Sequence, residues 1–488
     1  MRQRIENAQK EIDSKKMIVQ NGEMRQHYHF MPQSGWMNDP NGLIFFNGQY
    51  HGFYQTNPYN GFWDCMHWGH AVSKDLVHWE YLPLALAPSE EYDDYQKGGC
   101  FSGSAIEHEG KLYVFYTATA NHGNGSEQSQ CLAISEDGIN FEKYDGNPLF
   151  DAPEGIQPDS FRDPKVWKHE NKYYMVVGAS RNNRGLALIY ESADLYHWNF
   201  LNVLAESRGE WGFMWECPDF YQLGDKYVLT FSPMGSGDHT SVYLTGDFDY
   251  KTGKFDWHIS GEMDWGFDFY APQSMVAPDG RRLIVAWANE WEWMPLFKDW
   301  GPTYQEGWCG FFNVIREVRM CKDGTLAFVP VEEMEKIREN KFTQREIQVT
   351  EKPQQLKAGD GISFEMKFTL DLEETDADRV ELKLRCGKEK ETRCIFDLKN
   401  GELLVDRSCA DGWSVGTSRS VLKVSEKSLD VHIFSDQSSL EIFTDQYRNN
   451  HSNNIFAGND QDAISISAFG GRAVIRDYEA YGLQECFN

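Results

Sequence analysis

The pattern of apolar and polar residues repeats along the first two thirds of the chain. A polar turn followed by an aromatic-rich apolar stretch occurs five times, and its equivalent points are Tyr50, Tyr113, Tyr173, Tyr227 and Leu283. Successive points lie 63, 60, 54 and 56 residues apart. Short strands that repeat with such a period, separated by Gly or Asn turns, are typical of radially arranged four-stranded sheets. We therefore predict an all-β fold that begins with a five-bladed β-propeller, residues 31–335.

A second motif accompanies this repeat. It reads SKDLVHW, SEDGINF, SADLYHW and TGDFDYKTGKFDW in successive units, and its aspartates are Asp75, Asp137, Asp194 and Asp247. Two motifs that recur in phase favour a propeller over a β-rich domain with unrelated turns.

The pattern changes beyond about residue 340. Segments such as ISFEMKFTL, RVELKLRC and LDVHIFSDQSSLEIFT alternate apolar and polar residues. This alternation predicts a C-terminal β-sandwich, residues 345–488. The charged segment 331–345 is the expected connection. Residues 1–30 form a charged N-terminal lead-in, which we expect to be helical in part.

Three carboxylates stand near the start of three repeat units. Asp39, Asp163 and Glu216 precede their anchor tyrosines by ten or eleven residues, and Ser102 and Gln273 stand at the matching points of the other units. The first strand of each propeller blade lines the central axis, so we expect these side chains to converge. Each motif alone is more typical of a turn or an ion pair. Together they favour an active site for glycosidic cleavage, in which paired acids flank the bond.

The residues beside two of these acids suggest their roles. Glu216 lies between Trp215 and Cys217, and apolar surroundings would raise its pKa, as a proton donor requires. Asp163 follows Arg162. We therefore expect Asp163 to stay charged and to hold sugar hydroxyls and the developing positive charge.

Asp39 has polar neighbours. The amides of Asn38 and Asn41 could hydrogen-bond its carboxylate and keep it ionised, as a nucleophile requires. Cys217 is an alternative nucleophile, but no His and Asn partner pattern that would activate it is found. We favour a role for this cysteine in tuning Glu216.

Charge and composition exclude several classes of partner. The chain has 47 Lys and Arg against 75 Asp and Glu, a net charge of −28. Such a charge disfavours nucleic acid and anionic membranes, so we expect neither as a partner. No apolar run of about 18 residues and no signal-peptide core occur, and the ten cysteines form no CxxC pair. These features predict a cytoplasmic protein with reduced thiols.

Two histidine pairs raise the question of a metal. His67 and His70 form an HxxH, and His27 and His29 form an HxH, but no third ligand follows at a suitable spacing. Strand packing or sugar contact is the favoured interpretation, and no metal is expected.

The ordered motifs resemble a known family. WMNDPNG, FSGS, FRDP and WECP, with QTNPYNGFWDCMHWGHAVSKDLVHW, DFYAPQS and SLEIFTD, are similar to the invertase, or β-fructofuranosidase, group of glycoside hydrolase family 32. The resemblance implies a five-bladed propeller followed by a sandwich, no cofactor, and hydrolysis with retention through a fructosyl-enzyme. By motif, Asp39 matches the nucleophile, Asp163 the transition-state stabiliser and Glu216 the acid/base.

The resemblance also implies a set of sugar-binding residues: Asn38, Gln55, Trp63, Phe101, Ser102, Arg162, Tyr270 and Trp287. Two positions depart from the family pattern. Asp64 stands where glycine is frequent, and an extra carboxylate there could change what lies beyond the fructose. Ile315 replaces the proline of a Pro-Arg pair, where an effect limited to a strand end is expected.

Substrate choice stays open between sucrose, sucrose 6-phosphate and short fructo-oligosaccharides. A phosphate would need nearby Arg or Lys, and the net charge argues against an anionic substrate. Three other functions compete: an arabinan or xylan hydrolase of similar fold, a fructosyltransferase with the same acids, and a sugar-binding protein without activity. Edges of the sandwich could pair in a homo-oligomer.

Overall fold

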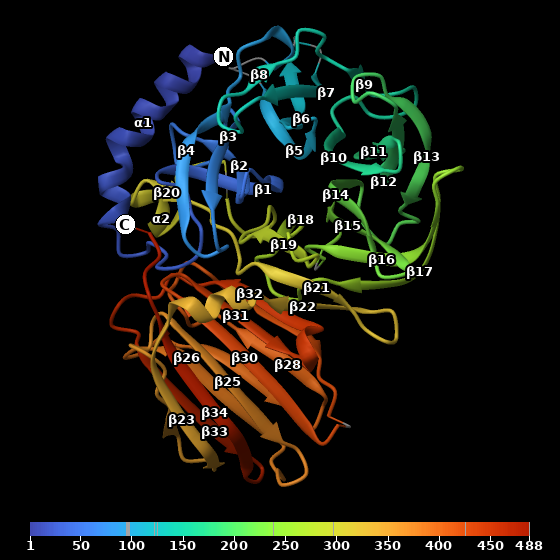
Figure 1. Cartoon of the computed structure of the whole chain (residues 1–488). Coiled ribbons are helices and arrows are strands. Elements are labelled where there is room, and N and C mark those ends of the chain that lie inside the picture. Colours follow the sequence, from blue (N-terminus) through green and yellow to red (C-terminus); the bar gives the residue numbers. More distant parts are fainter. Residues whose placement is uncertain are drawn as a thin grey trace.

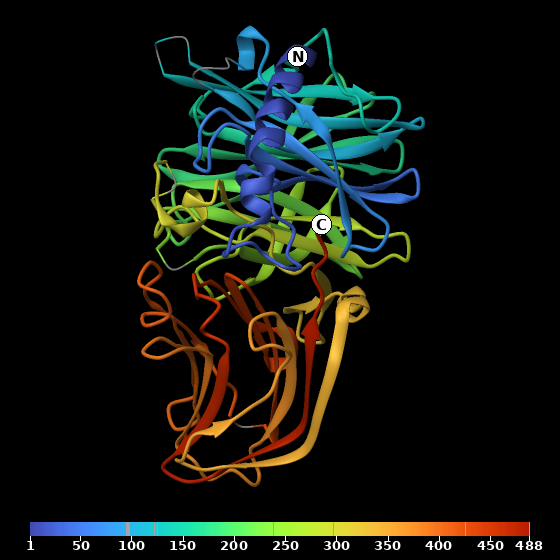
Figure 2. The ribbon, with the colours of Figure 1, turned by 90° about the vertical axis from the view of Figure 1, so that its left-hand side faces the viewer.

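Most of the chain is β-structure, in a ring of sheets followed by a two-sheet sandwich (Figure 1). The computed structural model describes residues 1–93, 98–121, 123, 125–237, 239–295, 297–424 and 426–487. The predicted helix in the lead-in is α1 (Arg2–Gln20), which runs along the outside of the ring (Figure 2). The other helices are short: η1 (Glu91–Asp93), α2 (Gly301–Gln305), η2 (Glu332–Ile337) and η3 (Asp445–Tyr447).

In the described residues, the strands up to Pro330 form five sheets. The first contains β1 (Gly35–Phe46), β2 (Gln49–Asn57), β3 (His67–Ser73), β4 (Trp79–Leu86) and β20 (Trp308–Cys309). The second contains β5 (Gly99–His108), β6 (Lys111–Asn121), β7 (Ser126–Ser135), β8 (Glu142–Lys143) and β9 (Phe150–Asp151). The third contains β10 (Phe161–His169), β11 (Lys172–Arg181), β12 (Arg184–Ser192) and β13 (Asn199–Glu206). The fourth contains β14 (Met214–Leu223), β15 (Lys226–Met234), β16 (Val242–Asp249) and β17 (Lys254–Glu262). The fifth contains β18 (Tyr270–Val276), β19 (Arg282–Trp287), β21 (Arg316–Met320) and β22 (Leu326–Pro330).

The first strands of these sheets form a closed ring around the centre (Figure 1). Strand β1 contacts β5 and β18, β10 contacts β5 and β14, and β14 contacts β18. The short β20 pairs in parallel with the start of β1, where Gly35 is opposite Trp308. This pairing ties the end of the ring to its beginning. The five first strands therefore lie around one centre.

A local hydrogen-bonding motif explains much of the sequence repeat. The Oδ1 atoms of Asp75, Asp137 and Asp194 each accept two backbone N–H bonds from residues two and three positions ahead, at 2.8–3.2 Å. Such bonds fix the turn after the third strand of a sheet. Asp247 differs, because it lies within β16 and pairs with Lys226 at 2.8 Å. The second motif therefore forms this turn in three units, whereas in the fourth Asp249 accepts a backbone N–H, from Lys251 at 3.0 Å, in place of Asp247.

The remaining strands form two six-stranded sheets that face each other in a sandwich. One contains β23 (Arg338–Val349), β34 (Ala473–Leu483), β25 (Phe364–Asp371), β30 (Ser428–Asp436), β31 (Ser439–Thr444) and β32 (Asn449–Asn454). The other contains β24 (Gln354–Gln355), β33 (Ala463–Phe469), β26 (Arg379–Cys386), β27 (Thr392–Asp397), β28 (Glu402–Asp406) and β29 (Thr417–Val421). Their apolar faces build one core. The segment 331–345, expected as a connection, contains η2 and the first part of β23. Because charged residues are frequent in this segment, the sequence pattern did not indicate that it contains the start of an edge strand.

A buried network of charges joins the sandwich to the ring. The guanidinium of Arg316 binds Asp264 at 2.9 Å and Glu441 at 2.7 Å, and all three side chains are buried. Glu441 also contacts His29 Nε2 at 2.9 Å, and Asp436 contacts His29 Nδ1 at 2.8 Å. Burial would lower the pKa of His29, but its hydrogen bonds to these two carboxylates raise it to about 9. The lead-in, the ring and the sandwich are thus held at one point.

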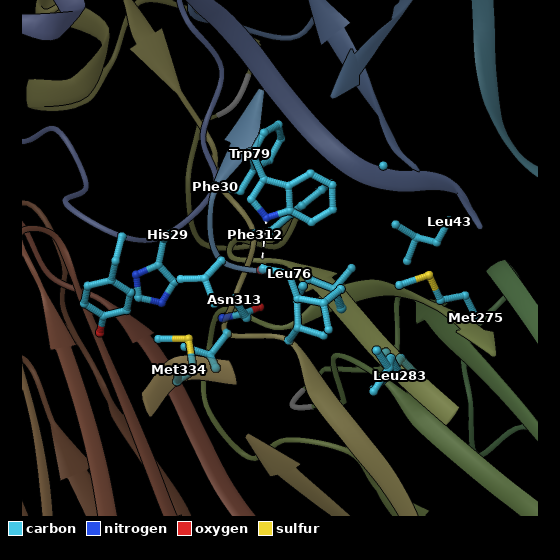
Figure 3. Close-up of a pocket in the computed structure, with 17 residues that line it drawn as sticks. His29, Phe30, Leu43, Leu76, Trp79, Met275, Leu283, Phe312, Asn313 and Met334 are labelled. Carbon is cyan, nitrogen blue, oxygen red and sulfur yellow. Dashed lines mark hydrogen bonds between the residues drawn. The ribbon is translucent and has the colours of Figure 1, made fainter. Parts of the chain in front are cut away.

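A small apolar cavity lies next to this junction (Figure 3). Its volume is about 40 Å³, and it is lined by residues of the lead-in, the first sheet, the fifth sheet and η2, among them Phe30, Leu76, Trp79 and Met334. The indole N–H of Trp79 is directed to the carbonyl of Leu76, at 3.1 Å. The apolar lining leaves few partners for water, so we regard the cavity as a packing gap.

Replacement of Arg316 tests this junction. Arg316→Met would leave Asp264 and Glu441 buried beside an apolar group, and we expect a loss of about 3–5 kcal/mol in the free energy of unfolding. Arg319→Met is the matched control, because Arg319 is 56% exposed in its pair with Glu317 and should cost less than about 1 kcal/mol. Urea denaturation measures both variants. Equal losses would show that the buried network does not hold the two parts together.

Candidate active site

The predicted acids share one cavity at the centre of the ring. Asp39 comes from β1, Asp163 from β10 and Glu216 from β14. The cavity has a volume of about 240 Å³. Its lining consists of Asn38, Asp39, Gln55, Trp63, Phe101, Ser102, Gln128, Asp159, Arg162, Asp163, Glu216, Met234, Trp291 and Phe297. Three distant segments therefore supply carboxylates to one site.

A β-bulge directs these side chains into the cavity. Strands β10, β14 and β18 share the same register shift, and the last paired residues before it are Arg162, Glu216 and Tyr270. The next residues, Asp163, Cys217 and Ala271, have φ values of 68°, 48° and 52°, and a proline follows each of them. Bulges re-aim side chains, and left-handed backbone at non-glycine residues is concentrated at functional sites.

The bulge also corrects the alignment of the repeats. The residue count back from the anchor tyrosines aligns Glu216 with Asp163. The strand pairing aligns Glu216 with Arg162, one residue earlier. Gln273 lies beyond the bulge and donates to the carbonyl of Gly103 at 2.8 Å, outside the cavity lining. Counting to within one residue could not separate these positions, because adjacent residues at a bulge face different directions.

Asp39 lies at the buried base of the cavity and accepts bonds from three side chains. Ser102 donates to Oδ2 at 2.5 Å, Asn38 donates to Oδ1 at 3.0 Å, and the thiol of Cys217 lies 3.4 Å from Oδ2. These donors fix the direction of the carboxylate. Burial, followed by the nearby carboxylates, raises the pKa of the Cys217 thiol well above its usual range, which disfavours a thiolate nucleophile here.

Two sequence expectations about this part of the site were wrong. Asn41 makes no hydrogen bond with Asp39; its side-chain oxygen Oδ1 accepts the N–H of Gly103 at 3.3 Å. The pKa of Asp39 is raised by burial and by the charge of Glu216, although its hydrogen-bond donors act in the opposite direction. Cys217 makes its hydrogen bonds with Asp163, through its backbone N–H, and with Asp39, through its thiol.

Glu216 has polar partners on both oxygens. Arg162 donates to Oε1 from Nε and Nη2 at 3.0 and 2.9 Å, and the hydroxyl of Tyr270 donates to Oε2 at 2.6 Å. Its neighbour Trp215 is directed away and stacks on Phe231 with ring centres 3.8 Å apart. The apolar surroundings expected for this carboxyl are therefore absent from its described contacts, because neighbouring residues of a strand point to opposite faces.

Asp163, which we expected to stay charged beside Arg162, has no close ion pair with it. Its Oδ2 accepts the N–H of Cys217 at 2.9 Å, whereas Nε of Arg162 is 4.0 Å away, because that guanidinium binds Glu216. Burial raises the pKa of Asp163, Arg162 lowers it, and the charges of Glu216 and Asp39 raise it again, to about 7. One cation does not compensate three buried carboxylates.

Six of the eight predicted sugar-binding residues line the cavity: Asn38, Gln55, Trp63, Phe101, Ser102 and Arg162. Tyr270 lies behind Glu216 and reaches the site through its hydroxyl. Trp287 is fully buried and packs against Trp36 and Trp291, with ring centres 5.5 and 5.0 Å away. It is not part of the lining. Asp64 is exposed and also lies outside the lining.

Five lining residues were missed by sequence reasoning: Gln128, Asp159, Met234, Trp291 and Phe297. Two of them, Trp291 and Phe297, belong to the tryptophan-rich segment WANEWEWMPLFKDW, whose composition was a usable signal for a sugar site. Gln128 accepts a bond from Arg162 Nη1 at 3.2 Å, and no sequence pattern indicated this contact.

The histidine pairs have structural partners. His70 bonds to His51 at 3.0 Å, and His67 Nδ1 lies 3.1 Å from the carbonyl of Cys65. His27 Nδ1 and the hydroxyl of Ser363 are 2.8 Å apart. Among the described residues, no group of three His, Cys, Asp or Glu could hold a metal ion. In the same residues, no helix combines the length and the apolar character needed to cross a membrane.

A β-propeller with converging carboxylates at its axis, followed by a β-sandwich, is the architecture of a class of glycoside hydrolases. The model described as "Glycosyl hydrolases family 32 N-terminal domain" matches residues 29–330, and that described as "Glycosyl hydrolases family 32 C terminal" matches residues 333–482. The chain belongs to glycoside hydrolase family 32.

Relatives within the family are similar over nearly the whole chain. A sucrose-6-phosphate hydrolase of Escherichia coli is 37% identical over 92% of this chain and 93% of its own length, and a raffinose invertase of Escherichia coli is 37% identical over 98% of each. The solved β-fructofuranosidase of Bombyx mori, a variant in complex with sucrose, has a TM-score of 0.83 at 32% identity and covers 99% of this chain and 98% of its own. The sucrose-6-phosphate hydrolase of Lactobacillus gasseri has a TM-score of 0.86 at 28% identity, with 98% and 96% coverage.

The raised pKa of Asp163 makes a prediction for stability. This pKa is about 7 in the fold and 3.8 ordinarily, so between about pH 4 and 7 the folded chain keeps a proton that the unfolded chain has lost. Rising pH therefore removes stability from the wild type across this window. We expect the stability advantage of Asp163→Asn over wild type to grow from pH 4 to pH 7 and then to level off in urea denaturation. The exposed Asp159→Asn serves as control, and an advantage of constant size would contradict the account.

Proposed function

We propose that this chain is a retaining β-fructofuranosidase, in which Asp39 attacks the anomeric carbon of a terminal fructosyl unit. Glu216 gives a proton to the leaving oxygen and later takes one from the water that releases fructose. Asp163 holds fructose hydroxyls and stabilises positive charge in the transition state. The observation that carries this proposal is the meeting of Asp39, Asp163 and Glu216 in one cavity of a family 32 chain.

The electrostatics of the free cavity support the role of Asp39. Its carboxylate lies within a group of three acids. Burial raises the pKa of Asp39 and Asp163, and repulsion from the neighbouring carboxylates also raises it. Formation of the fructosyl ester consumes the negative charge of Asp39 and relieves this repulsion. The two side chains that donate most closely, Ser102 and Asn38, hold the carboxylate in one direction before attack.

The contacts of Glu216 support its role as acid and base. Arg162 donates to one of its oxygens and Tyr270 to the other, so the direction of the carboxyl group is fixed. A leaving oxygen that approaches Glu216 would compete with Tyr270 for Oε2. The guanidinium of Arg162 also lies at the cavity wall, where it can bind a fructose hydroxyl.

The fold supports a division into three parts. We propose that each of the five sheets of the ring is one blade of a five-bladed propeller, residues 31–335, which carries the catalytic site. Residues 345–488 form the sandwich domain, with 338–345 belonging to its edge strand. Residues 1–30 are the lead-in.

We infer that uncharged fructosides such as sucrose are preferred to sucrose 6-phosphate. Among the described lining residues, Arg162 is the one basic side chain, against four carboxylates, and its guanidinium already binds Glu216. A phosphate there would meet repulsion without a free guanidinium. Sucrose and short fructo-oligosaccharides carry no such charge.

A cytoplasmic location and a homo-oligomer formed through sandwich edges are also proposed. The location is supported by the cysteines, because in the residues that the structure describes no disulfide bond joins them. Cell fractionation and size-exclusion chromatography test these two points, and a secreted or strictly monomeric protein would contradict them.

Glu216→Gln separates the acid role from a general loss of structure. With sucrose, whose leaving group needs a proton, we expect kcat/KM to fall roughly 100-fold or more. With a nitrophenyl β-fructofuranoside, whose leaving group departs without protonation, the loss of fructosyl transfer to the enzyme should be much smaller. Single-turnover kinetics measures this step for both substrates. Equal losses on the two substrates would remove the acid role from Glu216.

The proposed function is tested by fructose release from sucrose, sucrose 6-phosphate and a short inulin-type oligosaccharide. We expect release from sucrose to exceed release from its 6-phosphate, and release from all three to be lost in Asp39→Ala. A preference for the phosphate would overturn the substrate assignment alone. Release from arabino-oligosaccharides only, oligosaccharide products in place of fructose, or binding of sucrose without cleavage would each overturn hydrolysis of fructosides as the function.

A further inference from the structure

The rim of the active-site cavity includes an aromatic pair from the segment 288–300. Trp291 stacks on Phe297 with ring centres 5.8 Å apart and planes 16° apart, and Phe297 meets Trp63 edge-on at 5.5 Å. All three line the cavity, and Phe297 is 63% exposed. Asp39 is 9% exposed at the base. A sugar beyond the fructose would therefore lie against this pair, since aromatic faces pack on the apolar faces of sugars.

The same segment is anchored on its other side by the sandwich. Trp293 donates its indole N–H to Asp268 Oδ1 at 2.9 Å, and Asp268 Oδ2 binds Nη1 of Arg407 at 2.7 Å. The guanidinium carbon of Arg407 lies 4.2 Å from the ring centre of Trp293 and 4.2 Å from that of Phe267. The side chains of Arg407 and Asp268 are fully buried. Arg407 directly follows β28, so a residue of the sandwich holds Asp268 and Trp293. We call this set of contacts of Arg407 the clamp.

Two further contacts of the sandwich reach this segment. Trp300 packs edge-on against Trp413, with ring centres 5.5 Å apart and planes 87° apart. The side-chain amide of Asn454 donates to the carbonyl of Ala288 at 2.7 Å and to the side-chain oxygen of Asn289 at 2.8 Å. The segment is therefore held by the sandwich at its beginning, at Trp293 and at its end.

The clamp is also connected to the acid/base. Asp268 stands two residues before Tyr270, whose hydroxyl binds Glu216. The backbone N–H of Asn454 donates to Asp268 Oδ2 at 2.7 Å. Because Asp268 joins the sandwich both to Trp293 and to the start of β18, a displacement of the sandwich contact would move the rim first and Tyr270 second.

We propose that Arg407 is a positioning residue that sets selectivity for the sugar beyond the fructose. It acts through Trp293 and Asp268, which hold Trp291 and Phe297 against the cavity. The inference rests on the proposed function and extends it: the propeller provides the chemistry, and the sandwich determines how well the leaving-group sugar is held. Small displacements of a positioning element change rates by up to roughly 100-fold.

Three variants test the clamp, and the third leaves the buried pair of Arg407 and Asp268 unchanged. Arg407→Lys keeps the charge but loses the planar contact with Trp293. Trp293→Phe keeps a ring but loses the donor to Asp268. Trp413→Ala removes a residue that is 41% exposed and contacts Trp300. Trp265→Ala is the matched control, because Trp265 is 39% exposed and lies outside the cavity lining.

Kinetics is compared on sucrose and on methyl β-D-fructofuranoside, which has the same fructosyl group but no second sugar. For the three variants we expect KM for sucrose to rise roughly tenfold, with kcat for the methyl fructoside within about twofold of wild type. The control should change neither. Equal losses on both substrates, or no loss on sucrose, would overturn the role of Arg407 in selectivity.

Hydrogen exchange provides a readout that is independent of activity. Amides in peptides from the segment 288–300 should exchange faster in the three variants, whereas those of β1 and β2 should not change. Unchanged exchange in that segment would overturn the clamp, whether or not the chain cleaves fructosides. If wild type released no fructose from either substrate while exchange changed as expected, the proposed function would fail and the clamp would stand as a structural feature.

Discussion

The site depends on one electrostatic constraint: a single guanidinium, that of Arg162, shares the cavity with the carboxylates of Asp39, Asp163 and Glu216. Arg162 binds Glu216 through two nitrogens and stays 4.0 Å from Asp163. Burial and the remaining repulsion raise the pKa of Asp39 and Asp163. Such a group is unfavourable in the free protein. It persists because the surrounding structure fixes the backbone that carries each acid. In the proposed mechanism, the repulsion is relieved when Asp39 becomes an ester.

Several features of the fold provide this rigidity. The first strands close into a ring, and β20 seals the ring against β1. Equivalent bulges in β10, β14 and β18 direct Asp163, Glu216 and Tyr270 toward the same cavity. At the junction with the sandwich, Arg316 of the ring is buried against Glu441 of the sandwich at 2.7 Å, and Arg407 of the sandwich is buried against Asp268 of the ring at 2.7 Å. The sandwich therefore has its own core and also helps to hold the backbone around the site.

Sequence reasoning reached the architecture and the three acids because both depend on periodicity. The repeat places Asp39, Asp163 and Glu216 on first strands, and alternation identifies most sandwich strands. Sequence reasoning failed for contacts that depend on the direction in which a side chain points. Asn41 and Trp215 stand beside catalytic candidates in the sequence, yet a bulge and the strand pleat turn them away. Arg407 and Asp268 are 139 residues apart, and no local pattern indicates that they meet.

The central claim, a covalent fructosyl-enzyme on Asp39, is tested most directly by trapping that intermediate. The Glu216→Gln variant, mixed with a nitrophenyl β-fructofuranoside, forms the ester but lacks the base that activates water. Intact-mass spectrometry should then show one added fructosyl group, and peptide mapping should place it on Asp39. An adduct on Asp163 or another residue, or continued release of fructose without any adduct, would contradict the account.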